Sequence, residues 1–276
     1  MVDNIKYWRK INMGVKFCSL SSGSSGNCQY IETRKTRLLI DGGFSGIRIE
    51  KLLSSIDVCP TTIDYILVTH EHIDHVKGVG VLSRRYDIPI LANEKTWQAM
   101  NKTIGEIKSK NIRIIKTGDD FDLDDLGIDT FKVHHDAAEP IGYCFYYKDT
   151  KISIITDTGW VCDDMKSNIK GSSLYFMESN HDVDMLKEGS YPWYLKQRIL
   201  STEGHLSNAH AGEILSEVLN GDGEIVLLAH LSEENNTPTL AHSTVKDYIK
   251  GYGINIDKDI SLGLTYKDRT TKVYNL

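Results

Sequence analysis

In the first half of the chain, apolar positions form short runs that are continuous or alternate with polar residues, as is typical of β-strands. Such runs predict strands at residues 15–20, 28–32, 37–41, 64–69, 131–133, 141–147 and 151–156. Apolar residues recur at helical spacing over residues 46–55, 76–86 and 94–101, which predicts three helices.

The second half alternates helix and strand patterns. Helices are predicted near residues 162–170, 193–200, 208–219 and 240–251, and strands at 173–177, 224–229 and as a final pair within 260–273. Strand runs that cluster in each half, with helices after them, favour two sheets packed face to face with helices outside. Without an internal repeat or long linker, residues 13–276 are expected to form one domain, preceded by an appendage of residues 1–12.

The composition is ordinary for a soluble globular enzyme. Of the 276 residues, 40% are hydrophobic and 25% are charged, which argues against disorder. The longest apolar runs, such as residues 225–229, are too short to span a membrane, and the first ten residues do not resemble a secretory signal. The five cysteines form no Cys-x-x-Cys pair, which fits free thiols in a reducing cytoplasm, where we expect the protein.

The strongest chemical signal is the segment that follows the predicted strand 64–69. It places His70, His72, Asp74 and His75 within six residues, and it holds three of the ten histidines of the chain. Four such side chains cannot all point one way from a helix or a strand, whereas a tight loop can converge them on a pair of metal ions. Imidazole with carboxylate suits Zn²⁺, and also Mn²⁺ or iron. A polar loop with chance histidines is the alternative.

This motif resembles the signature of the metallo-β-lactamase superfamily. The resemblance implies an α/β fold of four layers (αββα), in which two mixed β-sheets pack face to face with helices outside. It also implies later ligands at His135, Asp157 and His230, each at or just after a predicted strand. Strand alternation alone does not decide between His134 and His135, and the family pattern Val-Ser-His-Asp-Ala selects His135.

The resemblance further implies how two divalent ions are shared among these residues. One ion is assigned to His70, His72 and His135, the other to Asp74, His75 and His230, and Asp157 bridges them. Asp41 matches an early aspartate of the family that orients ligands, although a carboxylate before two glycines could simply support a turn.

Two ions about 3.5–4 Å apart lower the pKa of a bridging water toward neutrality, which supplies a hydroxide nucleophile, and they clamp a phosphate or carbonyl oxygen. Asp74 belongs to this catalytic set as a ligand. His205 is the expected acid for the leaving group, and Glu178, at a strand end, could orient it. The alternative for His205 is packing at a helix cap. His181 could line the site or be solvated.

Several local runs resemble the bacterial YycJ/WalJ-type exonucleases within this superfamily. They are residues 21–27, 135–143, 178–182, 204–208 and 230–236. The resemblance extends from residue 13 to the end of the chain, and it implies 5′-to-3′ hydrolysis of phosphodiester bonds in DNA, with a role in repair.

The net charge of −6 does not by itself favour DNA binding, because a nucleic-acid binder usually carries a basic stripe. The interval from Asp157 to His230 holds 230 − 157 − 1 = 72 residues, too few for the cap domain of larger nuclease relatives. We therefore expect contacts with a strand end from Trp193, Lys196 and Arg198. An amphipathic helix with inward-packed aromatics is the alternative.

The serine- and glycine-rich loop of residues 21–27 is a weaker candidate for substrate binding. Its backbone N–H groups, with Asn27, could face a phosphate, but a simple hairpin turn fits equally well.

Two other functions are compatible with the ligand set. The first is thioester or lactone hydrolysis of the glyoxalase-II type, which does not require His205 or an aromatic and basic insert. The second is a non-catalytic metal-binding partner in a regulatory complex, against which stands the fact that every ligand position is filled. The oligomeric state cannot be read from the sequence.

Overall fold

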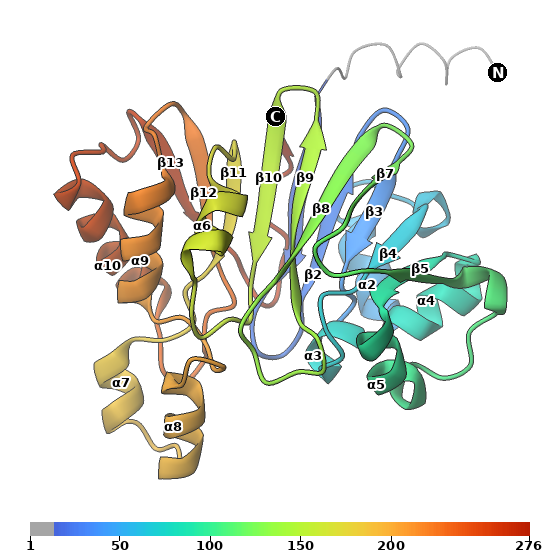
Figure 1. The fold of residues 1–276 in the computed structure, drawn as a ribbon, viewed down its shortest axis with the longest axis horizontal. Coiled ribbons are helices and arrows are strands. Elements are labelled where there is room, and N and C mark those ends of the chain that lie inside the picture. Colours follow the sequence, from blue (N-terminus) through green and yellow to red (C-terminus); the bar gives the residue numbers. More distant parts are fainter. Residues whose placement is uncertain (1–13) are drawn as a thin grey trace.

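The computed structural model describes residues 14–276, and the predicted appendage of residues 1–12 lies outside the described residues. Two mixed sheets of seven strands each form the centre of the molecule (Figure 1). Their orders are β14-β1-β2-β3-β4-β5-β6 and β13-β12-β11-β10-β9-β8-β7. The first sheet comes from the N-terminal half together with the last strand, and the second from the remainder, so the prediction of two sheets is confirmed.

The elements have the following bounds. The first sheet contains β1 (Lys16–Ser21), β2 (Cys28–Glu32), β3 (Arg37–Ile40), β4 (Tyr65–Leu67), β5 (Ile90–Asn93), β6 (Ile112–Ile115) and β14 (Tyr274–Asn275). The second contains β7 (Asp120–Leu123), β8 (Leu126–Lys132), β9 (Ile141–Tyr147), β10 (Thr150–Ile155), β11 (Leu174–Glu178), β12 (Glu224–Ala229) and β13 (Ile260–Leu264). The helices are α2 (Gly46–Ser54), α3 (Ile73–Val76), α4 (Val79–Tyr86), α5 (Glu94–Ile104), α6 (Asp163–Ile169), α7 (Val183–Glu188), α8 (Trp193–Leu200), α9 (Asn208–Val218) and α10 (Pro238–Gly251).

Three apolar clusters define the four layers. One lies between the sheets, where the rings of Phe17 and Phe176 are 5.6 Å apart at their centroids. A second packs α2, α4 and α5 onto the outer face of the first sheet, and a third packs α6, α9 and α10 onto the second (Figure 1). Because most strands carry apolar residues toward the inter-sheet core, the sheets are held together mainly by hydrophobic burial.

The parallel strands bring the predicted site residues to one edge. Strand β3 is parallel to β4, and β10, β11 and β12 are parallel to one another. Parallel strands that share a sheet have their carboxyl ends at the same edge. The loops after these strands therefore meet at the end where α3, α7 and α8 lie in Figure 1.

Some predicted elements differ from those observed. The single helix expected over residues 76–86 is two helices, α3 and α4, separated at Gly78, where a Cβ would lie 2.2 Å from the carbonyl oxygen of Phe44. Strands β5, β6 and β7 and the first part of β8 had no prediction. In β6 and β7 most side chains are exposed or half-buried, so no apolar run marks them. No helix within residues 14–276 is long and apolar enough to cross a membrane.

Candidate metal centre

The loop after β4 and the single turn of α3 position the histidine-rich motif. His70 lies in the loop, His72 directly precedes α3, and Asp74 and His75 lie in its first turn. The backbone N–H of His75 donates to the carbonyl of His72 at 2.9 Å, which closes the turn. The motif thus changes direction within six residues, and its side chains converge as the sequence predicted.

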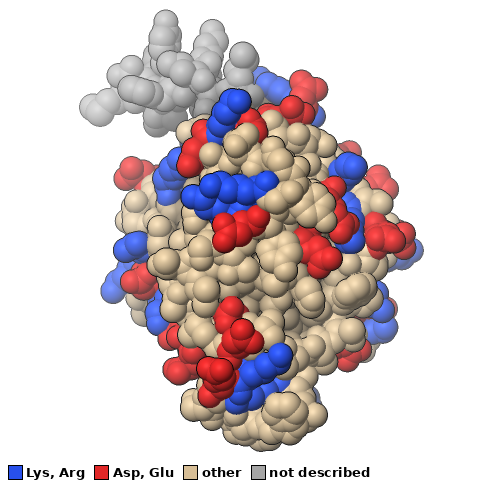
Figure 2. All heavy atoms as spheres, turned by 90° about the vertical axis from the view of Figure 1, so that its left-hand side faces the viewer, with Lys and Arg blue, Asp and Glu red and all other residues tan. Residues whose placement is uncertain are grey.

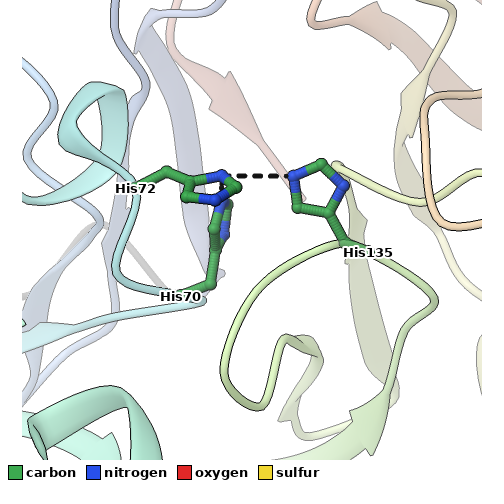
Figure 3. A group of neighbouring side chains, drawn as sticks. All are labelled: His70, His72 and His135. Carbon is green, nitrogen blue, oxygen red and sulfur yellow. Dashed lines mark hydrogen bonds between the residues drawn. The ribbon is translucent and has the colours of Figure 1, made fainter. Parts of the chain in front are cut away.

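Three imidazole rings form the first group of side chains (Figure 3). Nδ1 of His72 lies 3.1 Å from Nε2 of His70 and 3.2 Å from Nε2 of His135. Ligand nitrogens about 2.0–2.1 Å from a tetrahedral Zn²⁺ are about 3.3 Å apart, so this spacing suits a metal ion. His135, rather than His134, belongs to the group, because the backbone of His134 bonds to Thr158 and Gly159 and its ring lies outside it.

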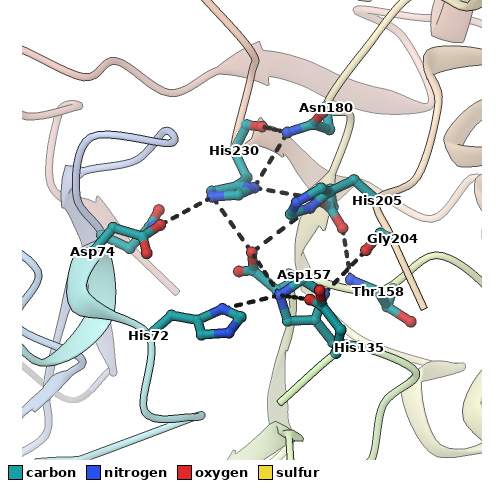
Figure 4. A network of polar contacts seen from close by, with 12 residues as sticks. His72, Asp74, His135, Asp157, Thr158, Asn180, Gly204, His205 and His230 are labelled. Carbon is teal, nitrogen blue, oxygen red and sulfur yellow. Dashed lines mark hydrogen bonds and ion pairs between the residues drawn. The ribbon is translucent and has the colours of Figure 1, made fainter. Parts of the chain in front are cut away.

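Asp74, His75 and His230 form the second group. Oδ2 of Asp74 lies 3.5 Å from Nε2 of His75 and 3.7 Å from Nε2 of His230. Asp157 lies between the two groups (Figure 4): its Oδ2 is 3.2 Å from Nε2 of His75, and its Oδ1 is 3.4 Å from Nε2 of His230. The same Oδ1 is 3.9 Å from Nε2 of His135. One carboxylate therefore faces both groups.

The side chains fit a pair of divalent cations. Oδ2 of Asp157 and Nε2 of His230 are buried and have no hydrogen-bond partner among the described residues. Such buried, unpartnered polar atoms are costly unless something binds them. Imidazole nitrogens and carboxylate oxygens are the donors that zinc, manganese and iron accept.

Two of the ring nitrogens that face away from the two groups contact protein groups of their own. Nδ1 of His75 lies 2.8 Å from Oδ2 of Asp41, and Nδ1 of His135 lies 3.1 Å from the carbonyl of Gly204. Asp41 also accepts from the backbone N–H and the hydroxyl of Thr69, both at 2.8 Å. The Asp41 carboxylate thus orients His75, as metal-binding histidines generally require. Thr69 had no prediction, although its place directly before His70 could have indicated it.

The electrostatics differ between the two groups. Burial lowers the pKa of His75, but three surrounding carboxylates outweigh this and hold the pKa well above its usual value. Burial likewise lowers the pKa of His230, but neighbouring carboxylates, first among them Asp157, raise it to about 10. Burial lowers the pKa of His70 and His135. One half of the site attracts positive charge, and the other offers neutral imidazoles, as metal binding requires.

Glu178 connects His205 to this centre. The carboxylate is fully buried at the end of β11. Its Oε1 lies 2.8 Å from Nδ1 of His205 and 3.0 Å from Nδ1 of His230, and its Oε2 accepts from the N–H of Thr158 at 2.8 Å. Burial raises the pKa of Glu178, but the two histidines, His205 first, hold it below the usual value. Ser207, rather than His205, caps α9, so helix capping is not the role of His205.

The predicted substrate contacts on α8 fall into two classes. Trp193 is 65% exposed and Tyr194 is 74% exposed, so the alternative of inward-packed aromatics is wrong. Lys196 is 8% exposed, and its ammonium donates to the carbonyls of Lys187 and Gly189 at 2.7 and 2.6 Å. The expectation that Lys196 contacts phosphate is therefore wrong, because its charge already satisfies the end of α7.

Arg198, Asn27 and His181 lie at the margin of the centre. Arg198 pairs with Asp136, the neighbour of His135. Nδ2 of Asn27 lies 3.1 Å from Nε2 of His75. His181 is 1% exposed, so it is not solvated, and neither ring nitrogen has a partner among residues 14–276.

Sequence comparisons relate the chain to known proteins. Residues 36–231 match the family model described as a β-lactamase superfamily domain. The exodeoxyribonuclease YycJ of Bacillus anthracis is 45% identical over 244 residues, which cover 88% of this chain and 92% of that protein. The exodeoxyribonuclease WalJ of Streptococcus pneumoniae is 43% identical over 261 residues, 94% of this chain and 97% of its own.

Solved structures resemble the fold at low sequence identity. The metallo-β-lactamase fold protein YhfI from Bacillus subtilis superposes with a TM-score of 0.73 at 16% identity, covering 95% of this chain and 100% of its own. Zinc-bound PqqB from Methylobacterium extorquens gives a TM-score of 0.69 at 14% identity, over 93% and 99% of the two chains. These likenesses concern the fold, and the predicted αββα architecture is confirmed by them.

Proposed function

Because the chain belongs to the β-lactamase superfamily and, within it, to the family of the YycJ and WalJ exodeoxyribonucleases, we propose that it is a metal-dependent nuclease that degrades DNA from the 5′ end. The observation that carries the proposal is the buried Glu178, which joins His205 to His230, a member of one of the groups of side chains that could hold a metal ion. A phosphodiesterase needs both a charged phosphate site and an acid for the leaving oxygen.

Two divalent ions would be held by this chain. His70, His72 and His135 would hold the first ion, Asp74, His75 and His230 the second, and Asp157 would lie between them. Zn²⁺ fits this set of donors best, and Mn²⁺ or iron also fits. When bound, the ions supply an activated water and stabilise the negative oxygens of the phosphate.

His205 is the proposed source of the proton for the leaving oxygen. Its Nδ1 is held by Glu178 at 2.8 Å, so Nε2 is the nitrogen left to donate. The Glu178 carboxylate accepts a hydrogen bond from Nδ1 and so orients the ring. The His205 side chain retains 17% exposure, so substrate can reach it.

Trp193 and Tyr194 are proposed to bind the end of the strand. The two rings are adjacent in α8 and both are exposed, and bases stack on exposed aromatic rings with little sequence preference. Thioester hydrolysis would use neither these rings nor His205. A purely metal-binding role would account for the contact of Glu178 with His230 but not for its contact with His205. A cytoplasmic location and a role in DNA repair are part of the proposal, the former resting on the unpaired pattern of cysteines.

Purified protein with measured metal content, incubated with DNA labelled at its 5′ or its 3′ end, tests the proposal. We expect release of short products from the 5′ end of single- or double-stranded DNA in Zn²⁺ or Mn²⁺. Matched RNA and a small thioester serve as competing substrates. Hydrolysis of the thioester with no cleavage of DNA by the same metal-loaded sample would overturn the proposal.

A further inference from the structure

The loop between β1 and β2 connects the centre to the surface. Near one end, the hydroxyl of Ser22 accepts from the backbone N–H of His230 at 2.9 Å. At the other end, the amide of Asn27 lies 3.1 Å from Nε2 of His75. A bond of 3.0 Å from the N–H of Gly26 to the carbonyl of Gly23 closes a turn between these ends, and its two tip residues, Ser24 and Ser25, are exposed. The loop thus presents two hydroxyl groups to solvent while its ends contact two candidate metal ligands.

Arg48 is connected to this turn through the ring of Phe44. The ring of Phe44 packs so closely on Gly26 that a Cβ there would lie 2.5 Å from it. The guanidinium of Arg48 lies 3.9 Å from the centroid of the same ring. Nη2 of Arg48 also donates to the carbonyl of Lys267 at 2.6 Å. Stacking and this bond fix the guanidinium, and the remaining donors of its fork of five are available for a ligand.

The loop that follows β13 also contacts the loop between β1 and β2. The hydroxyl of Ser21 donates to the carbonyl of Lys267 at 2.7 Å, and the N–H of Ser22 donates to the carbonyl of Tyr266 at 2.9 Å. The guanidinium of the exposed Arg269 lies 4.0 Å from the centroid of the Tyr266 ring. Two arginines, each stacked on an aromatic ring, therefore belong to segments that contact the loop with the two exposed serines.

The charges of this region are incompletely paired. Lys267 pairs with Glu233 at 2.5 Å, and Asp268 is exposed between Lys267 and Arg269. Within residues 14–276, no carboxylate forms a salt bridge with Arg48 or Arg269, whereas Arg198 on α8 pairs with Asp136. On the face shown in Figure 2, basic and acidic side chains are interspersed. Arg48 and Arg269 thus carry positive charge that no carboxylate of the described residues neutralises by a salt bridge, although the net charge of the chain is −6.

We propose that Ser24, Ser25 and Arg48 bind a backbone phosphate of the nucleic-acid strand, and that Arg269 contacts an adjoining phosphate. The inference rests on the proposed function and names the surface by which the strand is held next to the metal centre. Guanidinium groups match phosphate with two parallel hydrogen bonds, and serine hydroxyls complete the set of donors. Because both guanidinium groups are already held by aromatic rings, little side-chain entropy is lost on binding.

Binding of a labelled single-stranded oligonucleotide, measured by anisotropy over a range of salt concentrations, tests the proposal. The background is the metal-loaded His205→Ala protein, which retains every proposed ligand and should cleave DNA about 10²–10⁴-fold more slowly. Arg48→Gln should weaken binding about tenfold near 0.1 M salt and reduce the salt slope by about 0.7, the contribution of one phosphate contact to a single strand. Arg34→Gln removes the same charge from the exposed turn between β2 and β3, at the opposite end of the sheet, and should change neither quantity.

Two further variants separate charge from geometry. Arg48→Lys keeps the charge but loses the planar fork, so the salt slope should stay constant while affinity falls about threefold. The double variant Ser24→Ala, Ser25→Ala removes no charge and changes exposed side chains, so it should fold and bind a few-fold more weakly. These variants decide the question even where Arg48→Gln proves unstable.

The experiment distinguishes failure of this phosphate-binding surface from failure of the proposed nuclease function. A wild-type protein that degrades DNA, together with Arg48 and serine variants that bind like Arg34→Gln, would overturn this inference and leave the proposed function standing. A wild-type protein that neither binds nor cleaves DNA would overturn both.

Discussion

Replacing Glu178 with glutamine is the sharpest perturbation that the structure offers. The carboxylate receives contacts from His205, His230 and Thr158, at 2.8, 3.0 and 2.8 Å. The amide of Glu178→Gln has nearly the same shape, but one of its two ends donates rather than accepts. Whichever way the amide turns, a buried N–H group of a neighbour faces another donor.

The magnitude follows from those three contacts. One buried donor left without an acceptor costs about 1–3 kcal/mol, so the free energy of unfolding should fall by that amount. Loss of the carboxylate that orients a ligand histidine should weaken metal binding about 10–100-fold. Loss of the carboxylate that orients the His205 ring should lower kcat by about 10²–10⁴-fold, which corresponds to about 2.7–5.5 kcal/mol in the activation free energy.

The assay compares three variants at saturating metal. His205→Ala should lower kcat by about 10²–10⁴-fold with unchanged metal content, because His205 is not among the proposed ligands. The double variant should be about as slow as the slower single variant, since the two residues act as one unit. Glu224→Gln is the matched control: it removes another buried carboxylate, which accepts from Asn220 and Asp222 at the far end of β12. It should lower stability and leave kcat unchanged.

Three results would refute this reasoning. Full turnover in Glu178→Gln on a phosphodiester would remove the pair from the mechanism. Loss of metal from His205→Ala would make His205 a ligand instead of an acid. Strictly additive effects of the two substitutions would show that they act independently.

Three further predictions address other parts of the site. Elemental analysis should find two metal ions per wild-type chain, and Asp157→Asn should lose metal from both positions. A fully active sample with at most one ion per chain would contradict a carboxylate shared by two ions. Trp193→Ala should weaken binding of a strand end by about 1–3 kcal/mol. The melting temperature should stay the same, because the ring is 65% exposed. If the variant unfolds and its folded fraction binds DNA normally, the ring does not stack on a base. Lys196→Met should lower the free energy of unfolding by about 1.5–3 kcal/mol in denaturant titrations and leave DNA affinity unchanged. A variant with unchanged stability and weaker DNA binding would show instead that Lys196 contacts the DNA.

The sequence was sufficient for the architecture and for the convergence of the motif. The buried strand β12 is an apolar run, β10 alternates apolar and polar residues before two isoleucines, and Asp157 and His230 follow within two residues of the strand ends, so both pattern and chemistry mark these strands. Edge strands such as β6 and β7 escaped prediction because partial solvation removes the apolar signal, and main-chain hydrogen bonds define them instead.

The surroundings of the site were harder to predict, because they depend on contacts between distant segments. The Lys196 ammonium was expected at a phosphate, yet tertiary packing turns it toward the carbonyls at the end of α7. The stacked pair of Arg48 and Phe44 depends on Gly26, a residue of a different loop. Residue type predicts what a side chain can bind, whereas its partner is decided by segments that only the fold brings together.

Backbone conformation adds a last step that links the strands to the chemistry. Asp41, Asp157 and His230 have φ angles of 61°, 57° and 56°, and each lies within two residues of the end of its strand. Left-handed backbone costs an ordinary residue about 1–2 kcal/mol, although Asp and His tolerate it better than most. Strain that persists at three such positions indicates that the surrounding structure fixes them, and strained residues cluster at functional sites. At each of these positions the left-handed residue ends the alternation of the strand, and its side chain is buried in the site. The same three residues supply the carboxylate that orients His75, the carboxylate between the two groups, and the imidazole that Glu178 holds.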